Sequence, residues 1–346
     1  MSFNSTIASW YSENKRDLPW RSSRAPYNIW LSEIILQQTQ IKQGLPYYEK
    51  FISNFPTIYD LASASEIEVL KLWQGLGYYS RARNLHFSAK YITKELNGVF
   101  PKTQKELMQL KGVGDYTASA IASICYEEAV AVVDGNVYRV LARYFGVDTP
   151  INSSKGIRQF KILATSLLPN SNLGDYNQAI MDFGAKQCKP ISPSCMQCPL
   201  NVDCKAYATG STKILPVKLK KTKITKKHFN FIVLNSEDNK TYLEQRISKG
   251  IWQKLYQFPL IETSKPAAPK DLMEHSKAPS IFPETFKELL LFNNNEIVHK
   301  LSHLELHVRF WILKTSSPIK NAVKWSNIKS YPVPVVIQQF INNFQN

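Results

Sequence analysis

Hydrophobic residues recur at helical spacing through the first 208 residues of the chain. From residue 3 onward, amphipathic stretches alternate with Gly, Pro, Ser and Asn. The predicted helices span residues 29–42, 65–73, 81–96, 104–110, 116–125, 137–145 and 155–168. Pro56, Pro101 and Pro169 lie near their boundaries, as expected for a residue that has no amide donor. The pattern therefore predicts a mainly α N-terminal region.

The pattern changes after residue 212. Seven lysines and no acidic residue lie between positions 213 and 227, namely Lys213, Lys218, Lys220, Lys221, Lys223, Lys226 and Lys227. Such a segment is either a basic linker that runs along DNA or a solvated tether. Short β-type runs follow at 228–234, 241–245 and 308–313, and residues 283–292 are a candidate helix. We therefore expect an α+β second domain.

Composition adds a class of partner to this outline. Lys and Arg number 43 against 27 Asp and Glu, a formal net charge of +16. This excess favours binding to a phosphate backbone, although a basic soluble protein without such a partner has the same charge. No apolar run approaches the ~20 residues of a bilayer span, and the N-terminus lacks the pattern of a secretory signal. We expect a soluble cytoplasmic protein without a membrane partner.

Four of the five cysteines lie close together, with the spacing Cys188-x6-Cys195-x2-Cys198-x5-Cys204. In an intracellular chain this clustering indicates a metal centre rather than disulfides. Four thiolates suit either a tetrahedral zinc ion or a [4Fe–4S] cluster, and the spacing alone does not decide between them. The fifth, Cys125, lies in an apolar predicted helix and is expected to be a small core residue.

A glycine turn joins two of the predicted helices, in the sequence LKGVGDYTA at residues 110–118. Gly112 and Gly114 permit a tight turn and leave backbone N–H groups bare at the start of the next helix. A phosphate fits there, because the helix dipole favours an anion. Asp134 follows the apolar run 129–133 and precedes another predicted helix, where its simplest role is an N-cap.

Glu33 is a carboxylate in an apolar sequence, flanked by Trp30, Leu31, Ile34 and Ile35. A helical glutamate usually lies on a solvated face. If Glu33 is buried instead, desolvation raises its pKa and keeps a proton available for general acid catalysis near neutral pH.

Together these motifs resemble the helix-hairpin-helix DNA glycosylase superfamily. Three further blocks, at residues 30–40, 75–84 and 177–185, resemble its adenine DNA glycosylase (MutY) family, strongly over residues 3–208. The resemblance implies a mainly α helix-hairpin-helix glycosylase domain at 1–212 with an iron–sulfur loop at 188–204. A basic linker at 213–227 and an α+β, Nudix-like lesion-recognition domain at 228–346 would follow.

The resemblance also implies an activity. Members of this family flip adenine mispaired with 8-oxoguanine or guanine out of duplex DNA and hydrolyse its N-glycosidic bond. The implied cofactor is a [4Fe–4S] cluster on Cys188, Cys195, Cys198 and Cys204, and the expected state is a nucleoid-associated monomer.

Site residues follow from the matched motifs. Glu33 would protonate the adenine and Asp134 would stabilise the cationic sugar, with Tyr116 and Asn136 as supporting catalytic residues. The expected DNA-binding residues are Gln38, Thr39, Tyr78, Gly112, Gly114, Ser302 and His303. The expected adenine-pocket residues are Trp20, Arg21, Leu36 and Gln178.

Tyr116 stands where endonuclease III-like enzymes have a lysine that forms a Schiff base with the sugar. A phenol cannot form an imine, so we expect a monofunctional enzyme that leaves an abasic site.

The C-terminal region carries its own resemblance. Residues 250–259, GIWQKLYQFP, are similar to a segment of Nudix-like domains, but the metal-binding Nudix box is absent. We therefore expect a lesion reader without pyrophosphatase activity. Leu301, Ser302 and His303 align with the Phe-Ser-His loop of the family, with Leu in place of Phe; an ordinary strand–loop connection is the alternative. Tyr78 has an alternative as a core aromatic residue.

Two other functions are compatible with parts of the sequence. A bifunctional lyase for oxidised pyrimidines is disfavoured by Tyr116 and by the second domain. A non-catalytic DNA-binding module with a structural metal is disfavoured by the combination of Glu33 and Asp134.

Overall fold

The computed structural model describes residues 2–219 and 224–344, and its contacts divide the chain into two units. The first contains Met1–Ser63 and Asn84–Lys220, and the second contains Ala64–Arg83 and Lys221–Asn346. Lys220, Lys221 and Lys223 of the expected linker lie outside the described residues. No helix in the described ranges combines the length and apolar character that a membrane span needs.

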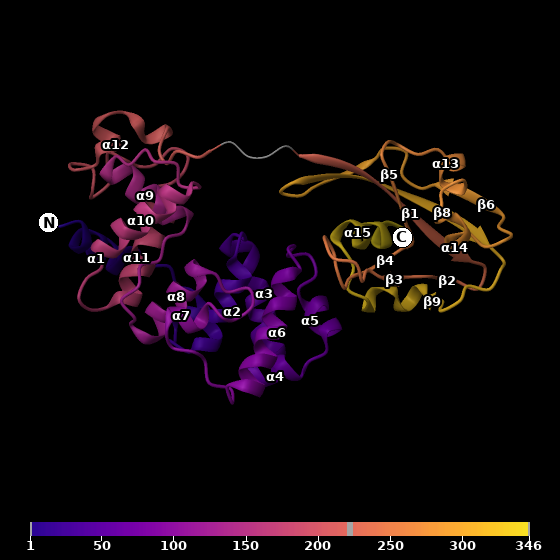
Figure 1. The fold of residues 1–346 in the computed structure, drawn as a ribbon, viewed down its shortest axis with the longest axis horizontal. Coiled ribbons are helices and arrows are strands. Elements are labelled where there is room, and N and C mark those ends of the chain that lie inside the picture. The colour runs from indigo at the N-terminus through magenta and orange to yellow at the C-terminus, as the bar shows by residue number, and fades with distance from the viewer. Residues whose placement is uncertain (1, 220–223, 345–346) are drawn as a thin grey trace. The chain divides into compact units, whose positions relative to one another are not determined.

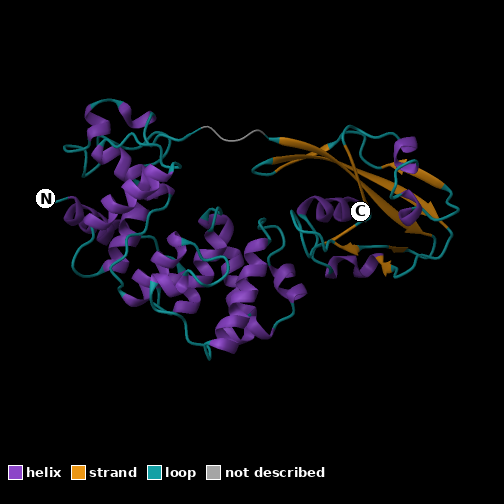
Figure 2. Cartoon of the chain, in the orientation of Figure 1, coloured by secondary structure: helices purple, strands orange, loops and turns teal. Residues whose placement is uncertain are grey.

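The first unit is built from helices joined by short loops, which confirms the mainly α prediction (Figures 1 and 2). Its helices are α1 (Phe3–Asn14), η1 (Pro19–Arg21), α2 (Pro26–Leu36), α3 (Ile41–Asn54), α4 (Ile58–Ser63), α7 (Gln104–Leu107), α8 (Asp115–Tyr126), α9 (Gly135–Phe145), α10 (Ser154–Ser166), α11 (Leu173–Lys186), α12 (Lys205–Ala208) and η2 (Ser211–Lys213). Helix α6 (Ser80–Glu95) begins in the second unit and continues into the first, and α5 (Glu66–Leu72) belongs to the second.

The predicted continuous helix at 29–42 is wrong. Helix α2 ends at Leu36 and α3 begins at Ile41, because Gln37 leaves the helical region and Gln38 has a φ of 57°. A left-handed residue interrupts the i→i−4 hydrogen-bond ladder. The apolar periodicity continues across the break, so the pattern alone does not reveal it.

Close approach explains two glycines. Gly112 has a φ of +82°, and a Cβ on it would lie 2.9 Å from the Cβ of Asn84. Gly184 of α11 lets that helix press against the start of α9, since a Cβ there would lie 2.7 Å from the Cβ of Asn136. Both therefore need a residue without a side chain.

The second unit is organised around a five-stranded mixed sheet of order β5-β1-β8-β6, with β7 also pairing with β8. The central strands β1 (Thr225–Ser236) and β8 (Leu304–Thr315) run parallel, with His228 beside His307. Strands β5 (Leu260–Thr263), β6 (Glu288–Leu291) and β7 (Ile297–Lys300) are antiparallel to their neighbours. The unit also contains β2 (Lys240–Thr241), β3 (Glu244–Gln245), β4 (Tyr256–Gln257), β9 (Val323–Lys324), α13 (Pro269–Met273), α14 (Ala278–Ile281), η3 (Trp325–Ser330) and α15 (Val335–Phe344). This confirms the α+β prediction for the second region.

Both faces of the sheet are covered. On one face Phe231 and Phe310 stack, and Phe340 of α15 lies over Phe310 with ring centroids 4.1 Å apart. On the other face Ile232, Trp311 and Leu313 form a core with Leu272 of α13. The alternating side chains of β1 and β8 thus enter separate cores.

The helix expected at residues 283–292 is wrong. Glu288–Leu291 form β6 instead, paired with Trp311–Lys314 of β8, because the sheet edge satisfies their backbone groups. Strand β1 begins at Thr225, so Lys226 and Lys227 lie in a strand rather than in a tether.

Candidate active site and cysteine loop

Glu33 lies in the interior of the first unit, on helix α2. It is 8% exposed, and the helix buries its residues on nearly every side. Burial raises the pKa of Glu33 to about 7; a hydrogen bond from Tyr116 opposes this rise, and the negative charge of Asp134 adds to it. A carboxyl with such a pKa holds its proton at neutral pH in a substantial fraction of molecules.

Asp134 is the N-cap of helix α9. Its Oδ1 accepts hydrogen bonds from the backbone N–H groups of Asn136 (2.9 Å) and Val137 (2.8 Å). Its Oδ2 accepts a third from the side-chain amide of Asn136, at 2.7 Å. Burial raises the pKa of Asp134, whereas these donated hydrogen bonds favour the charged form. The capping geometry fixes the orientation of the carboxyl.

Tyr116 lies near both carboxyls. The phenol donates to the sulfur of Met181 at 3.7 Å, and its side-chain hydrogen bond with Glu33 lowers the pKa of that carboxyl. Burial, followed by the charges of Glu33 and Asp134, raises the pKa of Tyr116 well above its usual value. The phenol is therefore a neutral donor at physiological pH. The structure thus brings together Glu33, Tyr116, Asp134 and Asn136, which come from three helices.

Two arginines beside this group form ion pairs that the sequence did not predict. Asp182 of α11 is fully buried and accepts from Arg16, and from Arg21 at 2.8 and 2.9 Å. Burial opposes the charge of Asp182, but these hydrogen bonds hold its pKa below the usual range. Arg21, expected in an adenine pocket, is thereby fixed by an ion pair across the helical unit. The other pocket candidates lie on different elements: Trp20 (5% exposed) on η1, Leu36 at the end of α2, and Gln178 (8% exposed) on α11.

Gln37 is a second residue that sequence reasoning missed. Its side-chain amide donates to the carbonyl of Gly112 at 3.0 Å and to the hydroxyl of Thr117 at 3.1 Å. It joins the end of α2 to the glycine hairpin. The neighbouring Gln38 is exposed and Thr39 half-buried, and Gly114 is the N-cap of α8. Only the unusual run of polar residues after an apolar helix signals this junction in the sequence.

The remaining DNA-binding candidates lie in the second unit. Tyr78 is 48% exposed and has a φ of 47°, which rules out the core-aromatic alternative. Ser302 and His303 are exposed in the turn between β7 and β8. The hydroxyls of Tyr78 and Ser302, which are 224 positions apart, form a hydrogen bond.

The four clustered cysteines line one common hollow in the loop between α11 and α12. Arg143 of α9 donates to the carbonyls of Lys189 (2.7 Å) and Leu215 (3.1 Å) and lies 3.4 Å from the sulfur of Cys188. Arg139 donates to the carbonyl of Cys188 at 2.7 Å and to Oδ1 of Asn136 at 2.9 Å. Helix α9 therefore connects the cysteine loop with the carboxyl cap at its own start.

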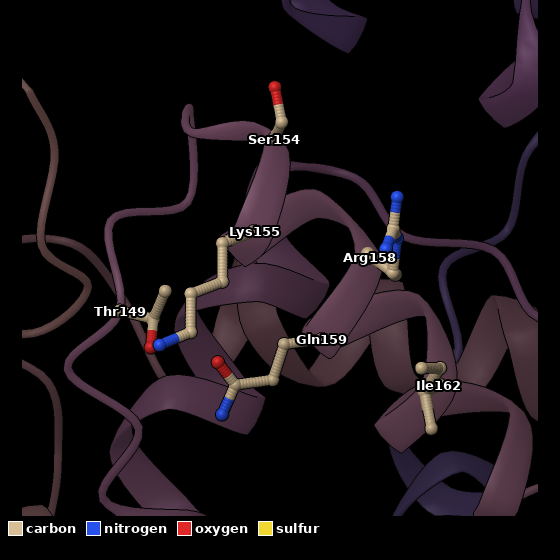
Figure 3. A pocket seen from close by; sticks show the side chains of 6 residues that line it. All are labelled: Thr149, Ser154, Lys155, Arg158, Gln159 and Ile162. Atoms are coloured by element: carbon tan, nitrogen blue, oxygen red, sulfur yellow. The ribbon is translucent and has the colours of Figure 1, made fainter.

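Another hollow lies at the N-terminal end of α10, lined by Thr149, Ser154, Lys155, Arg158, Gln159 and Ile162. Figure 3 shows Lys155 reaching toward Thr149, with Arg158 on a different side of the helix. None of the candidate catalytic residues lines it.

Comparisons with known proteins agree with this geometry. Residues 31–163 match the model of the HhH-GPD superfamily base excision DNA repair proteins, and residues 230–343 match the NUDIX domain model. The chain is 34% identical to the adenine DNA glycosylase of Buchnera aphidicola subsp. Acyrthosiphon pisum (strain APS), over 99% of this chain and 97% of that protein. It is 46% identical to the adenine DNA glycosylase of Homo sapiens over 59% of this chain and 39% of the human protein. A solved thermostable thymine-DNA glycosylase superimposes on 60% of this chain and 95% of its own, with a TM-score of 0.56 and 32% identity.

Proposed function

The chain belongs to the adenine DNA glycosylase family of base excision repair, and on this premise we propose that it excises adenine mispaired with 8-oxoguanine or guanine in duplex DNA. The family acts on N-glycosidic bonds. The proposal has three parts: the mispair that is recognised, the hydrolytic outcome, and the roles of individual residues. The observation that carries it is the grouping of the buried Glu33 with the half-buried Tyr116 and Asp134.

Glu33 serves as the general acid. Adenine is a poor leaving group as an anion, so bond cleavage needs a proton on a ring nitrogen. A carboxyl whose pKa is about 7 can hold that proton and release it to the base. The electron pair of the N-glycosidic bond then leaves with the protonated base.

Asp134 stabilises the cationic sugar that remains. As the bond breaks, the deoxyribose gains oxocarbenium character, which a fixed carboxylate can stabilise directly or through a covalent adduct. The three hydrogen bonds donated to Asp134 orient its carboxyl and favour the ionised form, against the burial that raises its pKa. Water then adds to the anomeric carbon and gives one proton to the Glu33 carboxylate, which restores the acid; if an adduct has formed, its bond to Asp134 breaks in this step. The two carboxyls take different roles because their environments differ.

Tyr116 supports a monofunctional reaction. The phenol cannot form an imine with the sugar, so no lyase step passes through this position. Its hydrogen bond to Glu33 makes it a positioning residue for the acid. The product would be an intact strand with an abasic site.

The cysteine loop fits an iron–sulfur cluster. Zinc bonds of about 2.3 Å place four sulfurs roughly 3.8 Å apart in a tetrahedron. Among the described residues, no three of these cysteines are grouped within such metal-binding reach, whereas all four line one hollow. Four thiolates around one hollow are the ligand set of a [4Fe–4S] cluster. A bound cluster would link the four cysteines through covalent bonds and so order the loop. The hydrogen bonds of Arg139 would connect the ordered loop with Asn136.

The residues proposed to contact DNA are chosen by their exposure and by the chemical groups that they offer. The N–H groups at the Gly112–Gly114 hairpin suit a phosphate. Gln38 and Tyr78 are proposed to enter the base stack, with Thr39 nearby as a further DNA contact; opening the stack costs a few kcal/mol. Trp20, Arg21, Leu36 and Gln178 are proposed to surround the flipped adenine. Ser302 and His303 would read 8-oxoguanine, without Nudix-type pyrophosphate hydrolysis.

The test is a strand-labelled duplex with one adenine opposite 8-oxoguanine, incubated with the protein and then treated with alkali. We expect a single break at that adenine after alkali and none before it, and no break in the matched adenine–thymine duplex. Cleavage without alkali that is trapped by borohydride would contradict the monofunctional assignment. Tight binding without any alkali-labile site would contradict the enzymatic role.

A further inference from the structure

A second group of potential metal ligands, which contains no cysteine, lies in the second unit. His228 of β1, His307 of β8 and Glu296 just before β7 each offer one ligand atom, and these atoms all lie within 4.8 Å of one another. The side chains are 13, 16 and 19% exposed. The proposed function uses none of them.

The register of the sheet creates this arrangement. His228 and His307 are direct neighbours in the parallel β1–β8 pair, so their rings stack on one face with centroids 4.7 Å apart. Between β6 and β7 the chain leaves the edge of β8, where Asn293 bonds to the backbone of Val308 and Phe310. This detour brings Glu296 back over the two rings.

The ligand atoms lie close enough together to share one metal ion, and without an ion the two histidines hydrogen-bond to different oxygens of Glu296. Nδ1 of His228 lies 3.3 Å from Oε1 of Glu296, and Nδ1 of His307 lies 2.9 Å from Oε2. Two ligand atoms about 2.0–2.1 Å from a tetrahedral zinc ion are separated by roughly 3.3 Å. Two imidazoles and one carboxylate are also a common zinc ligand set.

The surroundings orient the proposed ligands. Nε2 of His307 lies 3.1 Å from the carboxylate of Glu305, so Nε2 can carry the proton and leave Nδ1 free to bind a metal. A carboxylate behind a ligating histidine is the usual outer support of zinc sites.

Arg309 opposes metal binding, because its positive charge lies beside Glu296. Its Nε lies 3.3 Å from Oε1 of Glu296 but lacks hydrogen-bond geometry, and its Nη1 donates to the carbonyl of Ala267 at 3.0 Å. The guanidinium is therefore held from outside the cluster. It neutralises part of the carboxylate charge without occupying the Nδ1 positions.

We propose that His228, His307 and Glu296 bind one divalent transition-metal ion of the zinc class, with an open fourth position for water. The ion would tie β1, β8 and the segment before β7 together. His307 lies four positions after His303 in the sequence, so the bound ion would hold the base of the β7–β8 turn. The proposal does not depend on the excision chemistry.

The test measures Zn²⁺ bound by the full-length protein in equilibrium dialysis. We expect the wild type to bind one equivalent more than His228→Gln or His307→Gln. The cysteine loop contributes the same background to all three. His275→Ala, which removes a histidine outside the cluster, should leave the stoichiometry unchanged. Glu305→Gln should weaken the extra site by about tenfold or more.

A second measurement covers variants that fail to fold. In ¹⁵N spectra of the six histidines of the wild type, Zn²⁺ should shift the Nδ1 signals of His228 and His307 and leave the other four in place. Equal zinc stoichiometry in wild type and histidine variants, or unchanged Nδ1 signals, would overturn the proposal.

Discussion

At the scale of single residues, the environment of Glu33 decides its chemistry. An exposed glutamate would be ionised at neutral pH, whereas burial raises the pKa of Glu33 to about 7. The acid form is then abundant below that pH and is lost as the pH rises above it. Activity that depends on this proton should fall on the alkaline side.

Tyr116→Phe tests the link between the phenol and this acid. The hydrogen bond from Tyr116 lowers the pKa of Glu33, so its loss should raise that pKa. We expect the alkaline limb of the single-turnover excision rate to move to higher pH in the variant. Tyr138→Phe, a phenol on α9 that packs on Phe160, is the matched control and should leave the limb in place. An unmoved limb in Tyr116→Phe would separate the phenol from the acid.

Much of this residue-level account could be predicted from sequence. The apolar neighbours of Glu33 predict its burial, and the position of Asp134 before a helix predicts its capping role, both of which the structure shows. The ion pairs of Asp182 could not be predicted, because Arg16 is 166 positions away in the chain. A local sequence pattern does not indicate which distant residue will pair with a given side chain.

At the scale of elements, helix α9 connects the catalytic candidate Asp134, which is its N-cap, with the cysteine loop. Asp134 begins the helix, while Arg139 and Arg143 extend from its next turns to the loop. The carboxyl of Asp134 therefore has a capping role and a proposed catalytic role, and two different substitutions can distinguish these roles.

Asp134→Asn and Asp134→Ala should differ in stability but not in activity. Asparagine caps a helix about as well as aspartate, whereas alanine loses about 1 kcal/mol of cap stability. We expect the alanine variant alone to unfold at lower urea concentration. Both should lose adenine excision, because neither carries the charge that faces the sugar. An active Asp134→Asn enzyme would leave Asp134 with the capping role only.

Element boundaries show where sequence reasoning fails. Apolar periodicity spans residues 29–42, but the backbone turns at Gln37 and Gln38, and Gln37 then bonds to the hairpin. Residues 283–292 have helix-compatible composition, yet the unsatisfied edge of β8 draws 288–291 into a strand. In both cases a tertiary contact outweighs local propensity.

At the scale of the whole chain, two matched regions and a basic composition describe a DNA repair enzyme with an added domain. The helix-hairpin-helix match ends at residue 163 and the NUDIX match begins at residue 230. The mainly α and α+β classes were predictable because period and β-branched content differ between the two regions. The parallel pairing of β1 with β8 was not, since strand order leaves no local signal.

Ser302→Ala combined with His303→Ala tests the role of the second region. The proposal expects about a tenfold loss of the preference for adenine opposite 8-oxoguanine over adenine opposite guanine, as for one or two lost hydrogen bonds. Single-turnover rates on the two duplexes measure this ratio. Ser280→Ala with His275→Ala, from the same unit, is the control. An unchanged ratio would remove the turn at 302–303 from lesion recognition.

The most direct test of the central claim compares wild type with Glu33→Gln on a duplex with adenine opposite 8-oxoguanine. The amide keeps the shape of the side chain but cannot donate an acidic proton, so the single-turnover rate should fall by at least about a hundredfold. Affinity for the same duplex should stay within a few-fold of wild type. Excision by Glu33→Gln at close to the wild-type rate would contradict the account.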